Sequence, residues 1–134
     1  QRPTTSACKA GGWRGLDAGI LGAAVAAFSG TFNVAADGLA ACAGPHAGAC
    51  CYRVGPEVSR RFRGESLRRS GGEVFLDLGA EARAQLLDAG LSPAAVSVSP
   101  ECTICRPDRY FSYRRDGGRG ARCGQMLACL WLEA

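Results

Sequence analysis

Histidine and lysine are nearly absent from this sequence, and aromatic residues are few. His46 and Lys9 are the single representatives of their types in 134 residues, and aromatics make up 7% of the chain. No cluster of histidine, aspartate and glutamate surrounds His46, so the sequence predicts a loop residue there rather than a metal ligand. Aromatic residues also do not alternate with arginine, as they do on surfaces that bind single-stranded nucleic acid.

A long hydrophobic run is missing as well. No apolar stretch reaches the roughly 20 residues that a membrane-spanning helix needs, so we expect no membrane association. The opening residues, QRPTTSA, lack an initiator methionine and the basic-then-apolar pattern of a secretory signal. From this we expect a processed product or a fragment.

Cysteine is plentiful, with eight in the chain, but the spacing is irregular. A chain of this length can build its own core, and Cys42 and Cys129 fall in apolar runs. The pattern therefore predicts reduced, buried cysteines and an intracellular protein, either cytoplasmic or organellar.

Basic charge is supplied almost entirely by arginine, and the net charge is +4. Arginines cluster at residues 60–63, 68–69 and 114–122. A solvated face explains such clusters more often than a phosphate or nucleic-acid site does. A binding module for RNA or phosphate ligands is therefore a weaker hypothesis than the two given at the end of this section.

Helix and strand patterns mix along the whole chain, and they predict one α+β domain over residues 1–134. Strands are expected at residues 4–9, 39–43, 74–78 and 96–98, with a loop at 66–73. One helix is expected to begin at Leu16 and to end at Gly30. A short helix with Pro56 in its first turn and a third helix over residues 80–89 are also expected. Asp77 is expected to cap the last of these.

A Cys-x-x-Cys motif stands at Cys102 and Cys105. It could be half of a zinc site or a redox pair. A second such motif is missing, and the adjacent Cys50 and Cys51 look unsuited to hold one metal. We therefore interpret the motif as a turn that carries two thiols. A nucleophile paired with His46 is a further, weaker hypothesis for Cys50 or Cys51.

The segment SYRRDGG, residues 112–118, has two equally supported interpretations. Arg114 and Arg115 could clamp a phosphate or a carboxylate. Alternatively, the segment could end a hairpin and hold an internal arginine–aspartate pair.

Four ordered motifs resemble the laccase-domain family, whose members are also called polyphenol oxidoreductases and are related to purine nucleoside phosphorylases. The motifs are GGWRGLDAGI (11–20), GPHAGACCYRVGPEV (44–58), FLDLGAEARAQLLDAGL (75–91) and CTICRPDRYFSYRRDGG (102–118). The resemblance covers nearly the whole chain and matches the C-terminal half of a family domain.

The resemblance implies a two-sheet α/β/β/α architecture that is incomplete on its N-terminal side. It implies a zinc or copper site and the phosphorolysis of purine nucleosides, with deamination of adenosine alongside. It places substrate-pocket candidates at Trp13, Arg14, Phe111, Ser112 and Arg114, and leaves the catalytic residues unassigned.

The chain departs from the family pattern at the metal ligands. The family motif His-Ala-Gly-Trp-Arg-Gly has Ala10 at its histidine here, and the two other family ligands belong to the half that has no counterpart. Arg53 replaces the acid of the family's Cys-Tyr-Glu-Val-Gly. No metal is therefore expected in this chain alone.

Two hypotheses follow from the resemblance. The first is a catalytically degenerate, structural or partner-binding subunit. The alternative is an active phosphorylase or deaminase that takes its ligands from an N-terminal half. In either case, we expect the chain to associate with such a half, with a copy of itself or with a larger assembly. The ligands of an active form would be a purine nucleoside and phosphate.

Overall fold

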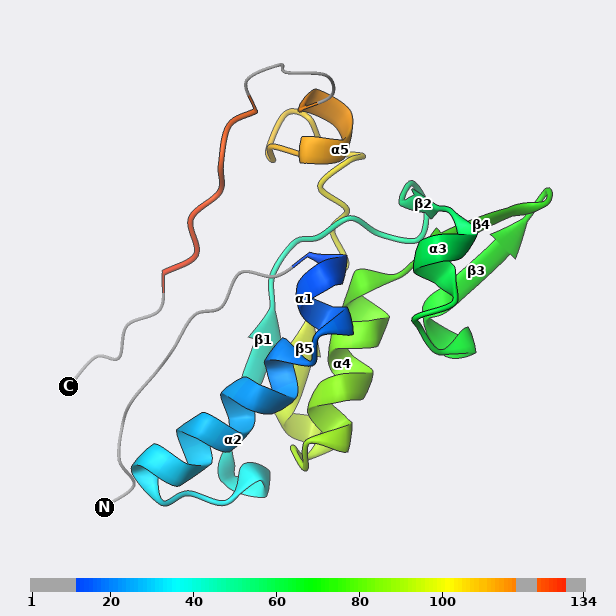
Figure 1. Ribbon diagram of the computed structural model, residues 1–134. Coiled ribbons are helices and arrows are strands. Elements are labelled where there is room, and N and C mark those ends of the chain that lie inside the picture. The colour runs from blue at the N-terminus through cyan, green and yellow to red at the C-terminus, as the bar shows by residue number, and fades with distance from the viewer. Residues whose placement is uncertain (1–11, 118–122, 130–134) are drawn as a thin grey trace.

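Two small sheets and the helices around them form the described part of the chain, residues 12–117 and 123–129, in the computed structural model (Figure 1). The helices are α1 (Trp13–Asp17), α2 (Ile20–Phe32), α3 (Pro56–Ser59), α4 (Leu78–Asp88) and α5 (Tyr113–Asp116), with short 3-10 turns η1 (Ala36–Gly38), η2 (Gly64–Ser66) and η3 (Pro93–Ala95). This mixed α/β arrangement confirms the predicted fold class. None of the helices described has both the length and the apolar character to cross a membrane.

One sheet pairs two distant segments in parallel, β1 (Ala41–Ala43) and β5 (Val96–Val98). The other is antiparallel, with the order β2 (Arg53–Val54), β4 (Glu73–Leu76), β3 (Leu67–Ser70). The strands predicted at 39–43 and 96–98 are confirmed, the first in shorter form. The expected strand at residues 4–9 lies outside the described residues.

The expected loop at residues 66–73 is wrong, because Leu67–Ser70 form β3 and Gly71 and Gly72 form a tight turn into β4. Gly71 and Gly72 both have positive φ, 58° and 78°, which glycine adopts without a steric penalty. The polar sequence misled the prediction because β3 is largely exposed. An exposed strand lacks the hydrophobic alternation by which strands are recognised.

The expected helix from Leu16 to Gly30 is two helices. Gly19, with φ of 73°, separates α1 from α2. The helix α2 continues through Gly30 and stops at Asn33, which has a left-handed conformation with φ of 51°. Both residue types tolerate this conformation, so the asparagine rather than the glycine ends the helix.

Helix α4 joins the two sheets and the two parts of the core. Asp77 caps it by accepting a hydrogen bond from the Ala80 amide at 2.9 Å, as predicted. Leu76, just before the cap, is completely buried in the first core cluster, and Leu86 lies in the second. The first cluster contains Leu16, Tyr52, Val54, Val58, Phe62 and Leu76, and the second contains Leu86, Leu91 and Val96.

A buried carboxylate anchors α4 to η2. Glu81 is 3% exposed, and its carboxylate accepts hydrogen bonds from the Ser66 hydroxyl at 2.7 Å and the Gln85 amide at 2.9 Å. The Arg63 guanidinium lies 3.4 Å from the same carboxylate. A buried charge is tolerated only with such partners.

We expect Ser66→Ala to lower the free energy of unfolding by about 1–3 kcal/mol, because it removes a donor from a buried carboxylate. Urea unfolding at a fixed protein concentration would measure the change. Ser70→Ala is the matched control, since Ser70 is exposed on β3, and it should change stability by less than about 0.5 kcal/mol. Equal effects of the two substitutions would contradict the role given to Ser66.

Candidate functional site

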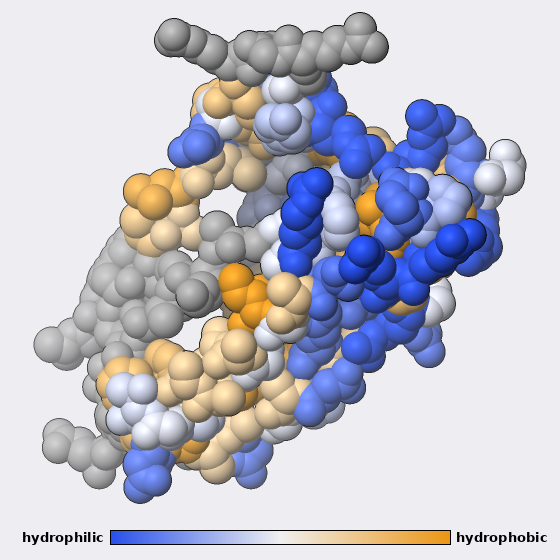
Figure 2. Space-filling view, in the orientation of Figure 1, coloured by the Kyte–Doolittle hydropathy of each residue, from blue (hydrophilic) through white to orange (hydrophobic). Residues whose placement is uncertain are grey.

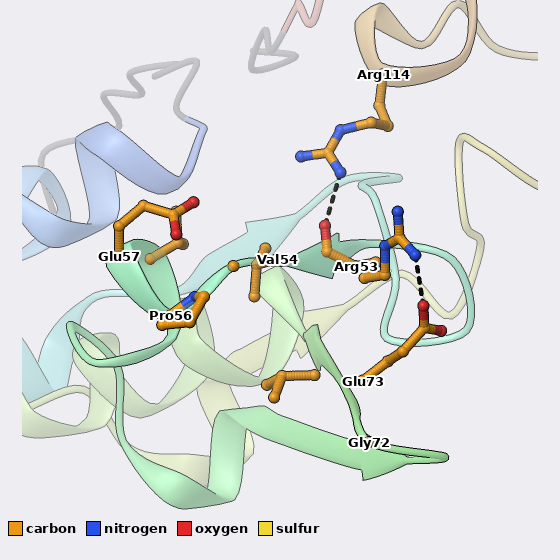
Figure 3. A pocket seen from close by; sticks show the side chains of 10 residues that line it. Arg53, Val54, Pro56, Glu57, Gly72, Glu73 and Arg114 are labelled. Atoms are coloured by element: carbon orange, nitrogen blue, oxygen red, sulfur yellow. Dashed lines mark hydrogen bonds and ion pairs between the residues drawn. The ribbon is translucent and has the colours of Figure 1, made fainter.

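Arg114 lines an open hollow of about 520 Å³ between α5, β2 and the β3–β4 turn. Its guanidinium donates a hydrogen bond to the Arg53 carbonyl at 2.6 Å and lies over the Tyr52 ring, 4.6 Å from the ring centroid. Figure 3 shows Arg114 reaching down from α5 to this carbonyl, with the Arg53 side chain paired to Glu73. The two arginines thus border one hollow, which Glu57 and Glu73 also line.

Charge in this hollow is nearly balanced, because two guanidinium groups face two carboxylates. Arg53 is held by Glu73, so Arg114 is the cation with fewer ionic partners. An anion entering the hollow would therefore meet the guanidinium of Arg114. Tyr52 itself is buried and is not among the residues that line the hollow, so the lining offers a cation to an anionic group but no aromatic ring to a base.

Within the segment SYRRDGG, residues Tyr113–Asp116 form the short helix α5 rather than the end of a hairpin. The Ser112 hydroxyl accepts a hydrogen bond from the Arg115 amide at 3.4 Å and begins α5. Arg115 pairs with Asp116 at 2.6 Å. Arg115 also donates to the carbonyls of Thr103, Ile104 and Tyr110.

The structure therefore contains the internal arginine–aspartate pair, one of the two interpretations left open for this segment. Arg115 is fully committed to it, since the same guanidinium holds three backbone carbonyls. The pair also raises the pKa of Arg115 and lowers the pKa of Asp116. Of the proposed clamp, only Arg114 keeps a side chain that borders a hollow.

Of the other pocket candidates, Phe111 and Ser112 directly precede α5, which carries Arg114, whereas Trp13 and Arg14 lie in α1. Trp13 is half-buried in α1 and packs against the first core cluster, while Arg14 is exposed and stacks on the Trp13 ring at 4.7 Å. Phe111 is 53% exposed. Arg114 is the one candidate of the five that lines the 520 Å³ hollow, and Figure 1 shows α1 apart from α5.

His46 lies at a second hollow, of about 370 Å³, together with Asp77, Glu101 and Cys102. Its Nδ1 bonds to the Gly44 carbonyl at 3.0 Å, and its Nε2 lies 3.8 Å from the Asp77 carboxylate. Within the described part of the chain, no hydrogen bond joins His46 to a thiol. The geometry thus lacks the nucleophile–base contact that a cysteine hydrolase needs.

The two loops at this hollow bring four thiols together. The sulfur atoms of Cys50, Cys51, Cys102 and Cys105, hereafter the thiol cluster, all lie within 4.8 Å of one another. Cys50 and Cys51, which were predicted to be unsuited to hold one metal, thus lie close to the two sulfurs of the Cys-x-x-Cys motif. The two cysteines lie in a turn rather than a strand, so both side chains can face the same side.

The pKa values of the cluster differ according to what each sulfur contacts. Burial acts to raise the pKa of Cys102, but the backbone N–H groups of Gly48, Cys105 and Ile104 outweigh it and lower the pKa to about 7. Desolvation and the neighbouring Cys105 thiol raise the pKa of Cys50 to about 11. The Cys102 thiol therefore loses its proton readily. A cation bound at the cluster would favour the formation of further thiolates.

Comparison with known proteins finds one family and several relatives that match nearly the whole chain. Residues 3–133 match the family described as multi-copper polyphenol oxidoreductase laccase. A purine nucleoside phosphorylase of Xylella fastidiosa is 37% identical over 131 residues, which cover 90% of this chain and 46% of that protein.

Solved structures agree with these matches. The crystal structure of YlmD from Geobacillus stearothermophilus has a TM-score of 0.74 and 35% identity, covering 84% of this chain and 44% of that one. A hypothetical protein YfiH from Bacillus licheniformis has the same TM-score at 30% identity, with 84% and 45% covered. The chain thus spans less than half the length of these relatives. Ala10, which occupies the histidine position of the family motif His-Ala-Gly-Trp-Arg-Gly, lies outside the described residues.

We expect Gly79→Ala to destabilise the protein, although alanine normally favours a helix. A Cβ at Gly79 would overlap the His46 imidazole and approach Val98 Cγ1 to 2.7 Å, and such overpacking costs about 1–3 kcal/mol. Urea unfolding would measure the loss, and the NMR signals of the single histidine would report displacement of its ring.

Gly30→Ala in α2 is the matched control, because nothing lies within 4 Å of a Cβ there. That substitution should stabilise the helix by about 0.5–1 kcal/mol. A Gly79→Ala protein with unchanged stability and unchanged histidine signals would show that α4 does not press on His46 in solution.

Proposed function

Because the chain belongs to the multi-copper polyphenol oxidoreductase laccase family, we propose that it acts as a partner-binding domain of that fold rather than as a self-sufficient enzyme. Helix α2 carries this proposal. Its 13 residues include no charged side chain, and none of them is buried. A helix that is apolar on all sides belongs in a protein interior.

The parallel sheet beside α2 supports the same conclusion. Among the described residues, β1 pairs only with β5, so each strand has one unpaired edge. A two-stranded parallel sheet is rare, since parallel sheets are usually buried with both faces covered. In the face shown in Figure 2, the apolar surface gathers where Figure 1 places α2, while the hydrophilic surface lies over β3 and β4.

The partner that we propose is the N-terminal portion of a laccase-family domain, on another chain or on a longer form of this one. The relatives are about twice as long as the matched region. A segment of that kind would add strands at the open edges of the β1–β5 pair and cover α2.

Purine nucleoside phosphorolysis is then not expected from this chain alone. Ala10 occupies the position where the family has a metal-ligating histidine, and alanine offers no ligand atom. The retained arginines are engaged elsewhere, Arg14 on the Trp13 ring and Arg114 on a backbone carbonyl.

An active phosphorylase completed by an N-terminal portion is the second candidate. The hollow bordered by Arg114 favours it, because an exposed guanidinium could hold the anionic group of a substrate. In this case the missing ligands would come from the partner segment.

We expect the purified chain to self-associate at micromolar concentration in sedimentation velocity, because α2 would otherwise stay uncovered. Ala27→Glu introduces a charge on an exposed position of α2 and should weaken the association roughly tenfold or more, since a desolvated charge costs above about 1.4 kcal/mol. Ser70→Glu, on the hydrophilic face, is the matched control and should leave it unchanged. A stable wild-type monomer would argue strongly against the proposal.

Release of free base from inosine or adenosine, with phosphate and zinc or copper supplied, should not exceed the rate without protein. Chromatography of the products would measure it on a sample shown to be folded. Release above that background would instead favour the second candidate. Arg114→Ala and Arg14→Ala would then show whether the retained arginines contribute to the activity.

A further inference from the structure

The thiol cluster joins two turns that are far apart in sequence. Cys50 and Cys51 precede β2, and Cys102 and Cys105 follow β5, a separation of 54 and 55 residues between the paired sulfurs. The Cys105 sulfur lies 3.4 Å from that of Cys50 and 3.2 Å from that of Cys51. These sulfurs are in close contact but are far beyond the length of about 2.05 Å of a disulfide bond.

We propose that the thiol cluster is a structural zinc site that fastens the turn before β2 to the turn after β5. A zinc ion with four thiolate ligands at about 2.3 Å is tetrahedral, which separates the sulfurs by about 3.8 Å. The observed separations, from 3.2 Å to an upper bound of 4.8 Å, bracket that value. Four soft thiolates in this geometry select zinc over hard cations such as magnesium or calcium.

The backbone around the cluster is already ordered for such a role. The two loops are joined by hydrogen bonds from the His46 amide to the Glu101 carbonyl at 3.3 Å and from the Thr103 amide to the His46 carbonyl at 2.8 Å. The Gly48 amide donates to the Cys102 sulfur at 3.2 Å. Contacts of this kind orient a metal-bound sulfur and stabilise its negative charge.

The packing at Gly48 also indicates a close fit. A Cβ at that position would lie 3.4 Å from both the Cys50 sulfur and the Cys102 Cβ. The turn that carries Cys50 is thus pressed against the turn that carries Cys102. Zinc would bind two ligands from each turn and would offset half of the negative charge that otherwise disfavours four adjacent thiolates.

This site differs from the metal site that the family resemblance implies. That site uses two histidines and a cysteine, one of them at the position of Ala10. The thiol cluster uses none of these positions, and it includes neither His46 nor any carboxylate. It offers four protein ligands and no open position in the tetrahedron, as structural rather than catalytic zinc sites do.

The test is the zinc content of the full chain, purified under reducing conditions from zinc-supplemented cells and measured by inductively coupled plasma mass spectrometry. We expect one zinc per chain. Cobalt(II) substituted into the apoprotein should show the strong visible bands of a tetrahedral site and thiolate-to-metal charge transfer in the near ultraviolet. Titration of the wild type with a mercurial should release the zinc in step with the thiols modified.

Cys102→Ser and Cys105→Ser should each lose most of the zinc and the cobalt charge-transfer signal. Cys42→Ser and Cys129→Ser are matched controls, because both cysteines are exposed and lie outside the cluster. If Cys102→Ser does not fold, Cys105→Ser tests an exposed ligand, and the wild-type cobalt spectrum does not depend on any variant.

Several results would overturn the proposal. One is wild-type protein without stoichiometric zinc whose cobalt form lacks charge-transfer bands. Another is an intact mass and peptide map that show a disulfide between two cluster cysteines under the same conditions. Equal zinc retention by Cys105→Ser and Cys42→Ser would also exclude the four-thiolate site.

Discussion

The cap at Asp77 is the interaction on which the two halves of this fold depend. Asp77 ends β4 and begins α4, and its carboxylate holds the Ala80 amide while its own amide donates to the Ser66 carbonyl at 2.8 Å. Leu76 before it enters the first core cluster, and Leu86 two turns later enters the second. The antiparallel and parallel sheets therefore share one rigid helix whose direction is set at this residue.

Around that helix, most of the charged groups stabilise the fold through hydrogen bonds and ion pairs. Glu81 is satisfied by Ser66, Gln85 and Arg63, and Arg115 closes the loop that leads to α5. A positively charged chain of this kind looks from its composition like a binder of phosphate or nucleic acid. The structure assigns many of the arginines to carboxylates, carbonyls and aromatic rings, and these contacts account for much of the clustering seen in the sequence.

The apolar helix α2 and the thiol cluster both indicate sources of stability outside the chain's own core. The core is divided into two small clusters, and small cores supply little net stability. A partner over α2 would extend the second cluster, and a metal between the two turns would fasten the segments around the first. The proposed partner and the proposed zinc would thus stabilise different parts of the same small fold.

The sequence by itself determined the family, the mixed α/β class, the Asp77 cap and the strands near residues 41 and 96. These are local or ordered patterns: a capping side chain before a helical period, alternating valines, and motifs in a fixed order. The sequence also allowed a hairpin end where α5 forms and predicted a loop where β3 forms. In those segments a weak local preference was overridden by the Ser112 cap and by pairing with β4.

Only the tertiary structure decided which distant side chains meet. Cys50 and Cys51 looked unsuited to bind one metal because adjacent residues of an extended chain point in opposite directions. Their turn removes that restriction, and a backbone bridge between His46 and Cys102 brings the second pair of thiols alongside. Such convergence depends on loop closure over more than 50 residues, and no short-range pattern in a sequence encodes it.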